Sequence, residues 1–282
     1  MTAVDLSRVS FRYPTSGDVL REVTLVAHEG RITWLFGPIG AGSSTLLLVA
    51  AGLAPALTGG RLEGAVRVLG HDWADPAGAR ALAGKVAYVT AMPYLQLSGM
   101  AETVFDEVAF APANLGWPRE RIESEVTAAL DRMGIARLRD RVPEELSGGE
   151  LQRVVIAAMY VLKPLVWLLD EPTSALDAAG RTLVHALLRE EAARGATAII
   201  ATEDPELGLA VADELVLLDA GSTVARDTPV TLLGGELMWE LGAGSTNVAE
   251  LARAARKLAT GPAPKLAPPY PLTVDAAVER WR

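Results

Sequence analysis

The residues most suggestive of chemistry form a glycine-rich run, Gly37-Pro38-Ile39-Gly40-Ala41-Gly42-Ser43-Ser44-Thr45. Apolar residues precede it at 32–36 and follow it at 46–53, which predicts a strand, a turn and a helix. A turn of this kind holds phosphate with the backbone N–H groups of the helix N-terminus. Gly37, Gly42 and Ser44 match the pattern G-x-x-x-x-G-K-[ST], but Ser43 stands at the lysine position. The run is therefore either a coincidental turn or a nucleotide site without its usual cation.

An acidic pair, Asp170 and Glu171, follows four apolar residues at 166–169. The apolar run predicts a buried strand, and open α/β sheets bind ligands beyond the C-terminal ends of their strands. At such an edge Asp170 and Ser44 would offer oxygen ligands to Mg²⁺. Glu171 is the candidate general base for a water molecule. The alternative, a buried strand that ends in two solvated acids, stays open from this run alone.

A second glycine-containing turn, Leu146-Ser147-Gly148-Gly149-Glu150, precedes an apolar helix predicted over 150–162. The free N–H groups and the positive dipole end of that helix suit a phosphate. Ser147 and Glu150 also match a capping box, so a capped helix start is the alternative. Tyr13 either stacks on a base or packs in the core. A further candidate segment follows the acidic pair, Ser174-Ala175-Leu176-Asp177.

The elements that position these residues alternate between strands and helices, which predicts an α/β fold with a largely parallel sheet. Residues 4–13 and 19–27 are expected to form an antiparallel pair. Further strands are predicted at 62–69, 86–89, 165–169, 197–201, 211–218 and 221–225, and helices at 101–109, 119–133, 150–162 and 177–194. Beyond residue 230 the pattern predicts helices at 236–241 and 248–259, a proline-rich linker at 261–271, and a last helix capped by Thr273.

Composition narrows the function. The 282 residues carry 26 basic and 35 acidic side chains, and this acidic balance disfavours a nucleic-acid partner. The absence of cysteine excludes disulfides, thiolate metal sites and cysteine nucleophiles, and the three histidines have no metal-ligand spacing. No signal peptide is expected at the N-terminus. The stretch between Arg31 and Arg61 has no charge, but its glycines and Pro38 break it, so any membrane role is expected to be peripheral.

Tyr13, the 37–45 loop, LSGGELQR at 146–153, VWLLDEP at 166–172 and SALD at 174–177 occur together in one order and spacing. Over about residues 3–230 the chain resembles the ATP-binding-cassette ATPases. The resemblance implies a phosphate-loop NTPase core with an antiparallel β subdomain and a helical subdomain, and ATP and Mg²⁺ as ligands. It also implies head-to-tail pairs, in which each ATP lies between one chain's phosphate loop and the other chain's signature, here Leu146–Glu150. Ser174–Asp177 would then be the D-loop.

Two further segments narrow the resemblance. Residues 91–97 and 102–116 look like the ATPases of energy-coupling-factor importers for vitamins, cobalt and nickel, and residues 269–277 are similar to their C-terminal dimerisation region. This implies a nucleotide-binding domain over 1–230 with a helical subdomain near 94–162, and a small helical extension over 231–282. The expected partners are a second ATPase chain and, through the helical subdomain, integral-membrane transporter subunits. The expected place is peripheral, on the cytoplasmic face of the cell membrane.

Three positions depart from the family pattern, all on the phosphate-loop side. Ser43 replaces the lysine, Ala91 stands at the glutamine position, and Glu203 stands where the family has a histidine facing the terminal phosphate. A charged hydrogen bond to phosphate contributes about 1.5–3 kcal/mol. A carboxylate about 4 Å from a phosphate charge costs about 4 kcal/mol at an effective dielectric constant of about 20. Efficient hydrolysis at this chain's own loop is therefore not expected.

The intact signature predicts an asymmetric pair, in which this chain donates LSGGE to a different ATPase whose own loop is complete. The first alternative is a non-hydrolysing regulatory or structural subunit that binds nucleotide. The second is a soluble cassette ATPase that acts on DNA or ribosomes, which the acidic charge disfavours.

Overall fold

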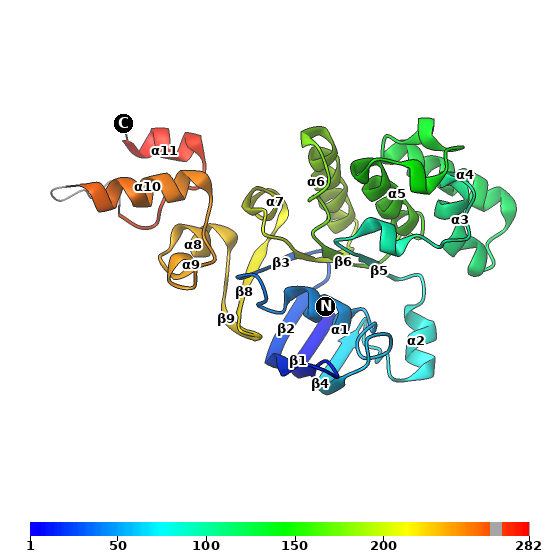
Figure 1. Ribbon diagram of the computed structural model, residues 1–282, viewed down its shortest axis with the longest axis horizontal. Helices are drawn as coiled ribbons and strands as arrows, with labels where there is room; N and C mark the ends of the chain where they lie inside the picture. Colours follow the sequence, from blue (N-terminus) through cyan, green and yellow to red (C-terminus); the bar gives the residue numbers. More distant parts are fainter. Residues whose placement is uncertain (260–266, 282) are drawn as a thin grey trace.

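The computed structural model describes residues 1–259 and 267–281 and contains two sheets (Figure 1). The larger sheet has six strands in the order β5-β6-β7-β3-β8-β9. Its strands are β3 (Ile32–Phe36), β5 (Val86–Val89), β6 (Val166–Asp170), β7 (Thr197–Ala201), β8 (Glu214–Asp219) and β9 (Ser222–Asp227). All neighbours are parallel except β8 and β9. Every residue of β3, β6 and β7 is buried, as continuous apolar runs of parallel strands require.

The smaller sheet is antiparallel, in the order β2-β1-β4, and confirms the predicted N-terminal pair. Its strands are β1 (Thr2–Arg12), β2 (Asp18–His28) and β4 (Arg61–Val68). Helix α1 (Ser43–Ala50) contributes Leu46 and Leu47 to one buried cluster that also holds Leu6 of β1 and Leu168 of β6. The α1 helix, and with it the turn that precedes it, is thus held between the two sheets.

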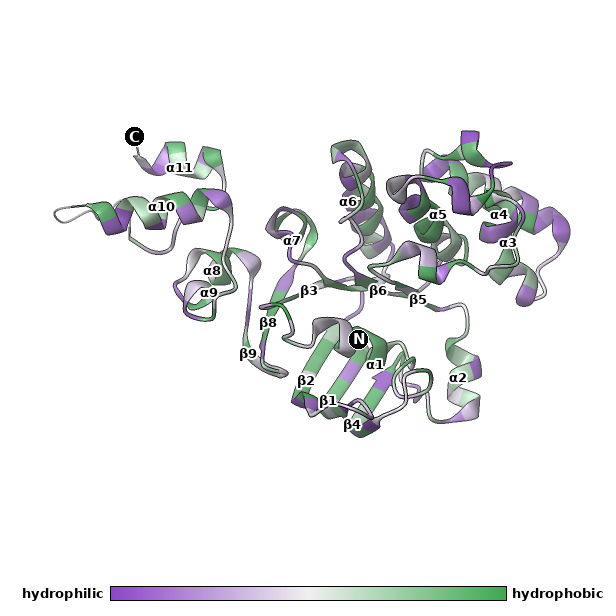
Figure 2. Cartoon of the chain, in the orientation of Figure 1, coloured by the Kyte–Doolittle hydropathy of each residue, from purple (hydrophilic) through white to green (hydrophobic). Residues whose placement is uncertain are grey.

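Most of the helices belong to a helical subdomain or to a C-terminal extension (Figure 1). Helices α3 (Val104–Asn114), α4 (Arg119–Arg132) and α5 (Gly148–Tyr160) lie together on one side and share a buried cluster with α6 (Ala178–Ala193). In Figure 2, α5 is largely green and α4 carries purple patches, in keeping with their inner and outer positions. Short segments complete this part of the chain, namely α2 (Pro76–Leu82), α7 (Pro205–Val211) and the 3-10 helices η1 (Pro93–Gln96), η2 (Ala136–Leu138) and η3 (Pro143–Glu145).

The C-terminal extension comprises α8 (Pro229–Gly234), α9 (Leu237–Glu240), α10 (Asn247–Leu258) and α11 (Val274–Trp281). Tyr270 is buried against Trp239 in edge-to-face contact, and its hydroxyl donates to Glu236 at 2.6 Å. Thr273 caps α11 as predicted, since its side chain accepts the N–H of Ala276. The predicted linker at 261–271 lies partly outside the described residues, which resume at 267. In the described parts of the chain no helix is long and apolar enough to cross a membrane.

Five element predictions need correction. The helix expected from residue 101 begins at Val104, because Thr103 caps it by accepting the N–H of Asp106. The strand expected from residue 211 begins at Glu214, because the preceding residues form α7. Helices α2, α7 and α8 were not predicted. In α2, α7 and α8 a capping residue is followed by proline at the first helical position, which is a helix start signal that hydrophobic periodicity does not register.

Candidate functional site

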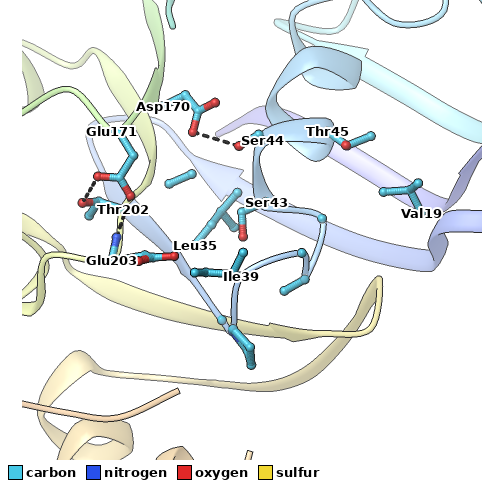
Figure 3. A pocket seen from close by; sticks show the side chains of 16 residues that line it. Val19, Leu35, Ile39, Ser43, Ser44, Thr45, Asp170, Glu171, Thr202 and Glu203 are labelled. Atoms are coloured by element: carbon cyan, nitrogen blue, oxygen red, sulfur yellow. Dashed lines mark hydrogen bonds between the residues drawn. The ribbon is translucent and has the colours of Figure 1, made fainter. Parts of the chain in front are cut away.

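The 37–45 turn connects β3 to α1 and forms one wall of an open cavity of about 290 Å³ (Figure 3). Its glycines have backbone reasons to be there. A Cβ on Gly37 would lie 2.1 Å from the carbonyl oxygen of Leu218 in β8, and Gly42 adopts a φ of 102° as the N-cap of α1. Gly42 makes no side-chain cap, so the first-turn N–H groups of α1 are available to an anionic ligand.

The predicted magnesium ligands come together across this cavity. Ser44 Oγ donates to Asp170 Oδ1 at 3.0 Å, which joins α1 to the end of β6 (Figure 3). Burial raises the pKa of Asp170, and the hydrogen bond from Ser44 opposes that rise. Two adjacent oxygen donors beside a phosphate-binding turn fit Mg²⁺. When bound, Mg²⁺ would neutralise phosphate charge next to these two residues.

Glu171 is held by the neighbouring strand end. Its φ is 47°, and its Oε1 accepts the backbone N–H of Glu203 at 2.8 Å while its Oε2 accepts the hydroxyl of Thr202 at 3.0 Å. Burial raises the pKa of its carboxyl, against the two hydrogen bonds. Both oxygens therefore bind the loop between β7 and α7. The general-base role of Glu171 stays a prediction.

The three departing positions are placed differently. Ser43 and Glu203 both line the cavity, and in Figure 3 the Glu203 side chain points toward Ile39 and Ser43. Ala91 follows β5 and lies outside the cavity lining. Among the described residues that line the cavity, Asp170, Glu171 and Glu203 are acidic and none is basic. The net charge of the side chains around this phosphate-binding turn thus opposes an anion.

Gln96 does not compensate for Ala91. Its amide donates to the carbonyl of Tyr88 at 2.5 Å and accepts the N–H of Thr90 at 3.0 Å, so it ties η1 back to the end of β5. Gln96 lines a separate small cavity with Phe110 and Met159 instead.

Tyr13 lies beside the phosphate-binding turn. Its hydroxyl hydrogen-bonds with Thr45 Oγ1 at 3.1 Å, and its ring packs edge-on against Phe11 with centroids 4.9 Å apart. The Tyr13 ring thus packs against the core, which was the alternative to stacking on a base, while its hydroxyl contacts the turn.

The 146–150 turn is capped and exposed. Ser147 Oγ accepts the N–H of Glu150, and the Glu150 carboxylate accepts from Ser147 in return, which confirms the capping box. Arg137 donates to the same carboxylate at 2.6 Å, and these bonds, those from Ser147 foremost, lower the pKa of Glu150. Ser147 and Gly148 are exposed, and none of the five residues lines the cavity at the 37–45 turn. Within one chain, the two glycine turns do not form one site.

The 174–177 segment packs under this second turn. A Cβ on Gly149 would lie 2.9 Å from the carbonyl oxygen of Ala175. Asp177 caps α6 by accepting the N–H of Gly180 at 2.8 Å. Arg181, which sequence reasoning missed, donates to the carbonyl of Leu176 at 3.2 Å and lies 3.6 Å from Asp204. In the sequence, the only indication of these contacts was that Arg181 lies one turn after the residue that caps α6.

A family model described as ABC transporter matches residues 20–174. The chain belongs to the ABC transporter family. A putative ABC transporter ATP-binding protein of Methanothermobacter marburgensis is 32% identical over 100% of this chain and 99% of its own length. The nickel import ATP-binding protein NikO of Rhodobacter capsulatus is 38% identical over 82% of this chain and 91% of its own length. The energy-coupling factor transporter ATP-binding protein EcfA2 of Methanospirillum hungatei is 36% identical over 80% of this chain, which spans 55% of that relative.

The solved structures agree with this assignment. The structure of cbiO1 from Clostridium perfringens, titled as part of the ABC transporter complex cbiONQ, has a TM-score of 0.71 and 26% identity. It covers 89% of this chain and 98% of its own. The chain is thus an ABC ATPase with the expected fold, a phosphate-loop NTPase core with an antiparallel β subdomain, a helical subdomain and a small C-terminal helical extension, and it is most similar to the ATPases of energy-coupling-factor importers.

Proposed function

We propose that this ABC chain is an ATP-binding subunit of an importer of the energy-coupling-factor, nickel or cobalt type, and that it is the degenerate half of an asymmetric ATPase pair. In that pair it donates the Leu146–Glu150 signature to the ATP site of a different ATPase chain. One observation carries the proposal. The phosphate-loop cavity has three acidic side chains and, among its described lining residues, no basic one, whereas the signature turn is complete, capped, and exposed at Ser147 and Gly148.

The electrostatics of the cavity support the first half of this proposal. A bound triphosphate would meet Glu203 where a cation or a neutral histidine would favour it, and Ser43 supplies no charge. Ser44 and Asp170 still offer ligands for Mg²⁺, so nucleotide binding without efficient hydrolysis is the expected behaviour.

The surface supports the expected partners. Exposed apolar side chains gather on η1, α3 and the loop between them, beside the small cavity of the helical subdomain, namely Met92, Tyr94, Leu95, Met100 and Phe110. Such a patch favours docking of integral-membrane subunits, with the chain peripheral to the cytoplasmic face of the membrane. Leu251 of α10 and Val274 and Val278 of α11 are also exposed, which suits a dimerisation role for the C-terminal extension.

ATP turnover tests the proposal. The purified chain, its candidate partner ATPase and the mixture of the two are assayed with Mg²⁺, and the partner is identified from the proteins that co-purify from membranes. We expect little turnover by the chain alone and clear turnover by the pair. Substantial turnover by the chain alone, abolished by Glu171→Gln, would refute the asymmetric pair.

A second candidate is a regulatory or structural subunit that binds nucleotide and supports no turnover. The Glu171 geometry favours it, because both carboxylate oxygens bind the Thr202–Glu203 loop. Nucleotide binding by the pair with no hydrolysis at either site would select this candidate.

A further inference from the structure

The phosphate-loop cavity has two chemically different ends. At one end Val19 lines the cavity, and the hydroxyl of Tyr13 hydrogen-bonds with Thr45. At the other end Glu171 and Glu203 lie at the C-terminal ends of β6 and β7. Figure 3 shows Val19 and Thr45 on one side and the two glutamates on the opposite side. The aliphatic Val19 end suits a nucleoside, so the phosphate chain of a nucleotide runs toward the glutamates.

The groups that would surround the phosphates next to α1 differ from those that would surround the terminal phosphate. Next to α1, Gly42 leaves the first-turn N–H groups open, and Ser44 and Asp170 lie 3.0 Å apart as ligands for Mg²⁺. These groups favour phosphate oxygens directly over the helix N-terminus. Farther along, each added phosphate brings more negative charge toward Glu203, and no basic residue among the described cavity lining balances it.

The backbone at Glu203 is held in place by Glu171. The N–H of Glu203 donates to Glu171 Oε1 at 2.8 Å, and Thr202 Oγ1 both donates to Glu171 at 3.0 Å and accepts the N–H of Asp204 at 3.1 Å. Asp204 in turn caps α7. These bonds fix where the Glu203 side chain begins, at the phosphate end of the cavity.

We infer that the phosphate-loop site of this chain selects a nucleoside diphosphate over the triphosphate, with Glu203 as the specificity-determining residue. The inference rests on the proposed function in one respect, that the cavity binds nucleotide. It adds that the site holds ADP while the partner's loop turns over ATP. It also assigns a positioning role to Glu171, whose side chain holds the loop that carries Glu203.

Equilibrium binding to the purified full chain tests this selectivity. Titration calorimetry with Mg²⁺ and ADP, ATP or the β,γ-imido analogue of ATP gives the three Kd values. We expect ADP to bind about tenfold more tightly than either triphosphate. Glu203→Gln removes the charge at nearly constant shape, and we expect it to improve triphosphate binding by about tenfold while the Kd for ADP changes less than about twofold. Glu206→Gln is the matched control, because Glu206 is exposed and lies outside the cavity lining.

Each other outcome is informative. Triphosphate binding as tight as ADP binding, equal effects of Glu203→Gln on both nucleotides, or no binding of ADP would each overturn the selectivity. Failure of the asymmetric pair is a separate result, since it is measured as turnover of the mixture and not as a ratio of Kd values. Diphosphate selectivity without activation of a partner would leave this inference standing and remove the proposed function.

Discussion

The phosphate loop and the signature turn are built alike, each a glycine-containing turn that opens a helix, but their side chains differ. At the phosphate loop Gly42 caps α1 with no side chain, and the surrounding cavity is acidic. At the signature Ser147 and Glu150 close a capping box, and Ser147 and Gly148 are exposed. Backbone geometry requires Gly37 and Gly42 in the first turn and Gly149 in the second. The side chains around them decide which turn favours a phosphate and which disfavours one.

Gly37 illustrates the difference between a structural and a chemical motif. It is required because the carbonyl of Leu218 occupies the space of a Cβ, whatever ligand the turn holds. Glu203, by contrast, has an exposed side chain. A glycine pattern therefore identifies the fold of a phosphate loop, and only the side chains that face the phosphate indicate whether it hydrolyses ATP.

The largest expected effect comes from charge placed on the signature turn. Gly148→Asp meets no close neighbour, since the nearest atom to a Cβ there is 3.9 Å away, and aspartate suits the first turn of a helix. A carboxylate there would face the partner's nucleotide, and we expect turnover of the pair to fall by about 100-fold or more. Gly17→Asp is the control, because a Cβ at Gly17 has nothing within 4 Å and lies on the β1–β2 loop. Unchanged turnover with Gly148→Asp would contradict the donated signature.

Returning the three departing positions to the family pattern should reduce the functional difference between the two turns. The triple variant Ser43→Lys, Ala91→Gln and Glu203→His replaces two unfavourable electrostatic contributions and one missing polar group. We expect turnover by the chain alone to rise by about tenfold or more. Adding Glu171→Gln to the triple variant should then abolish the gain if Glu171 can act as a base. An unchanged rate in the triple variant would show that another feature of the cavity limits hydrolysis.

The next largest expected effect is on stability, and it tests whether a glycine of the phosphate loop is needed for the fold or for the ligand. Gly37→Ala places a methyl group 2.1 Å from the Leu218 carbonyl oxygen, so β8 or the loop must shift. We expect a loss of about 1–3 kcal/mol in the free energy of unfolding, measured by urea titration without nucleotide. Gly17→Ala, where space is open, should change stability by less than about 0.5 kcal/mol. A tolerated Gly37→Ala would mean that this glycine serves the ligand and not the fold.

Much of this molecule could be predicted from its sequence, because short apolar runs that contain β-branched or aromatic residues, such as 32–36 and 166–169, favour buried strands. Hydrophobic periodicity missed α2, α7 and α8, which are too short to show a face. Their starts are nevertheless indicated in the sequence by a capping residue followed by proline, at Asp75-Pro76, Asp204-Pro205 and Thr228-Pro229.

Within the site, the sequence does not predict which motifs lie next to one another in space. The motifs that line the cavity are recognisable one by one along the chain. The hydrogen bond between Glu171 and Thr202, 31 residues apart, exists because β6 and β7 are neighbours in the sheet. No local pattern encodes that adjacency. The role of Thr202 could therefore be assigned only from the fold.

The smallest expected effect is a pH dependence at Glu171, which distinguishes a half-buried carboxyl held by the loop from a solvated one. Burial raises its pKa, so between the ordinary glutamate pKa and the raised value the folded chain binds more protons than the unfolded chain. Stability contributed by this group therefore falls as pH rises through that window.

Glu171→Gln keeps an oxygen to accept the Glu203 N–H and an amide to donate to Thr202, but it does not ionise. We expect its Tm without nucleotide to exceed that of the unmodified chain at neutral pH, and the difference to vanish as pH falls below the ordinary glutamate pKa. Glu206→Gln, at an exposed carboxyl, is the control and should show no such change. A Tm of Glu171→Gln below that of the unmodified chain at neutral pH, with the gap closing toward acid pH, would instead mean that the ionised carboxylate stabilises the loop, and that Glu171 holds Glu203 through its charge.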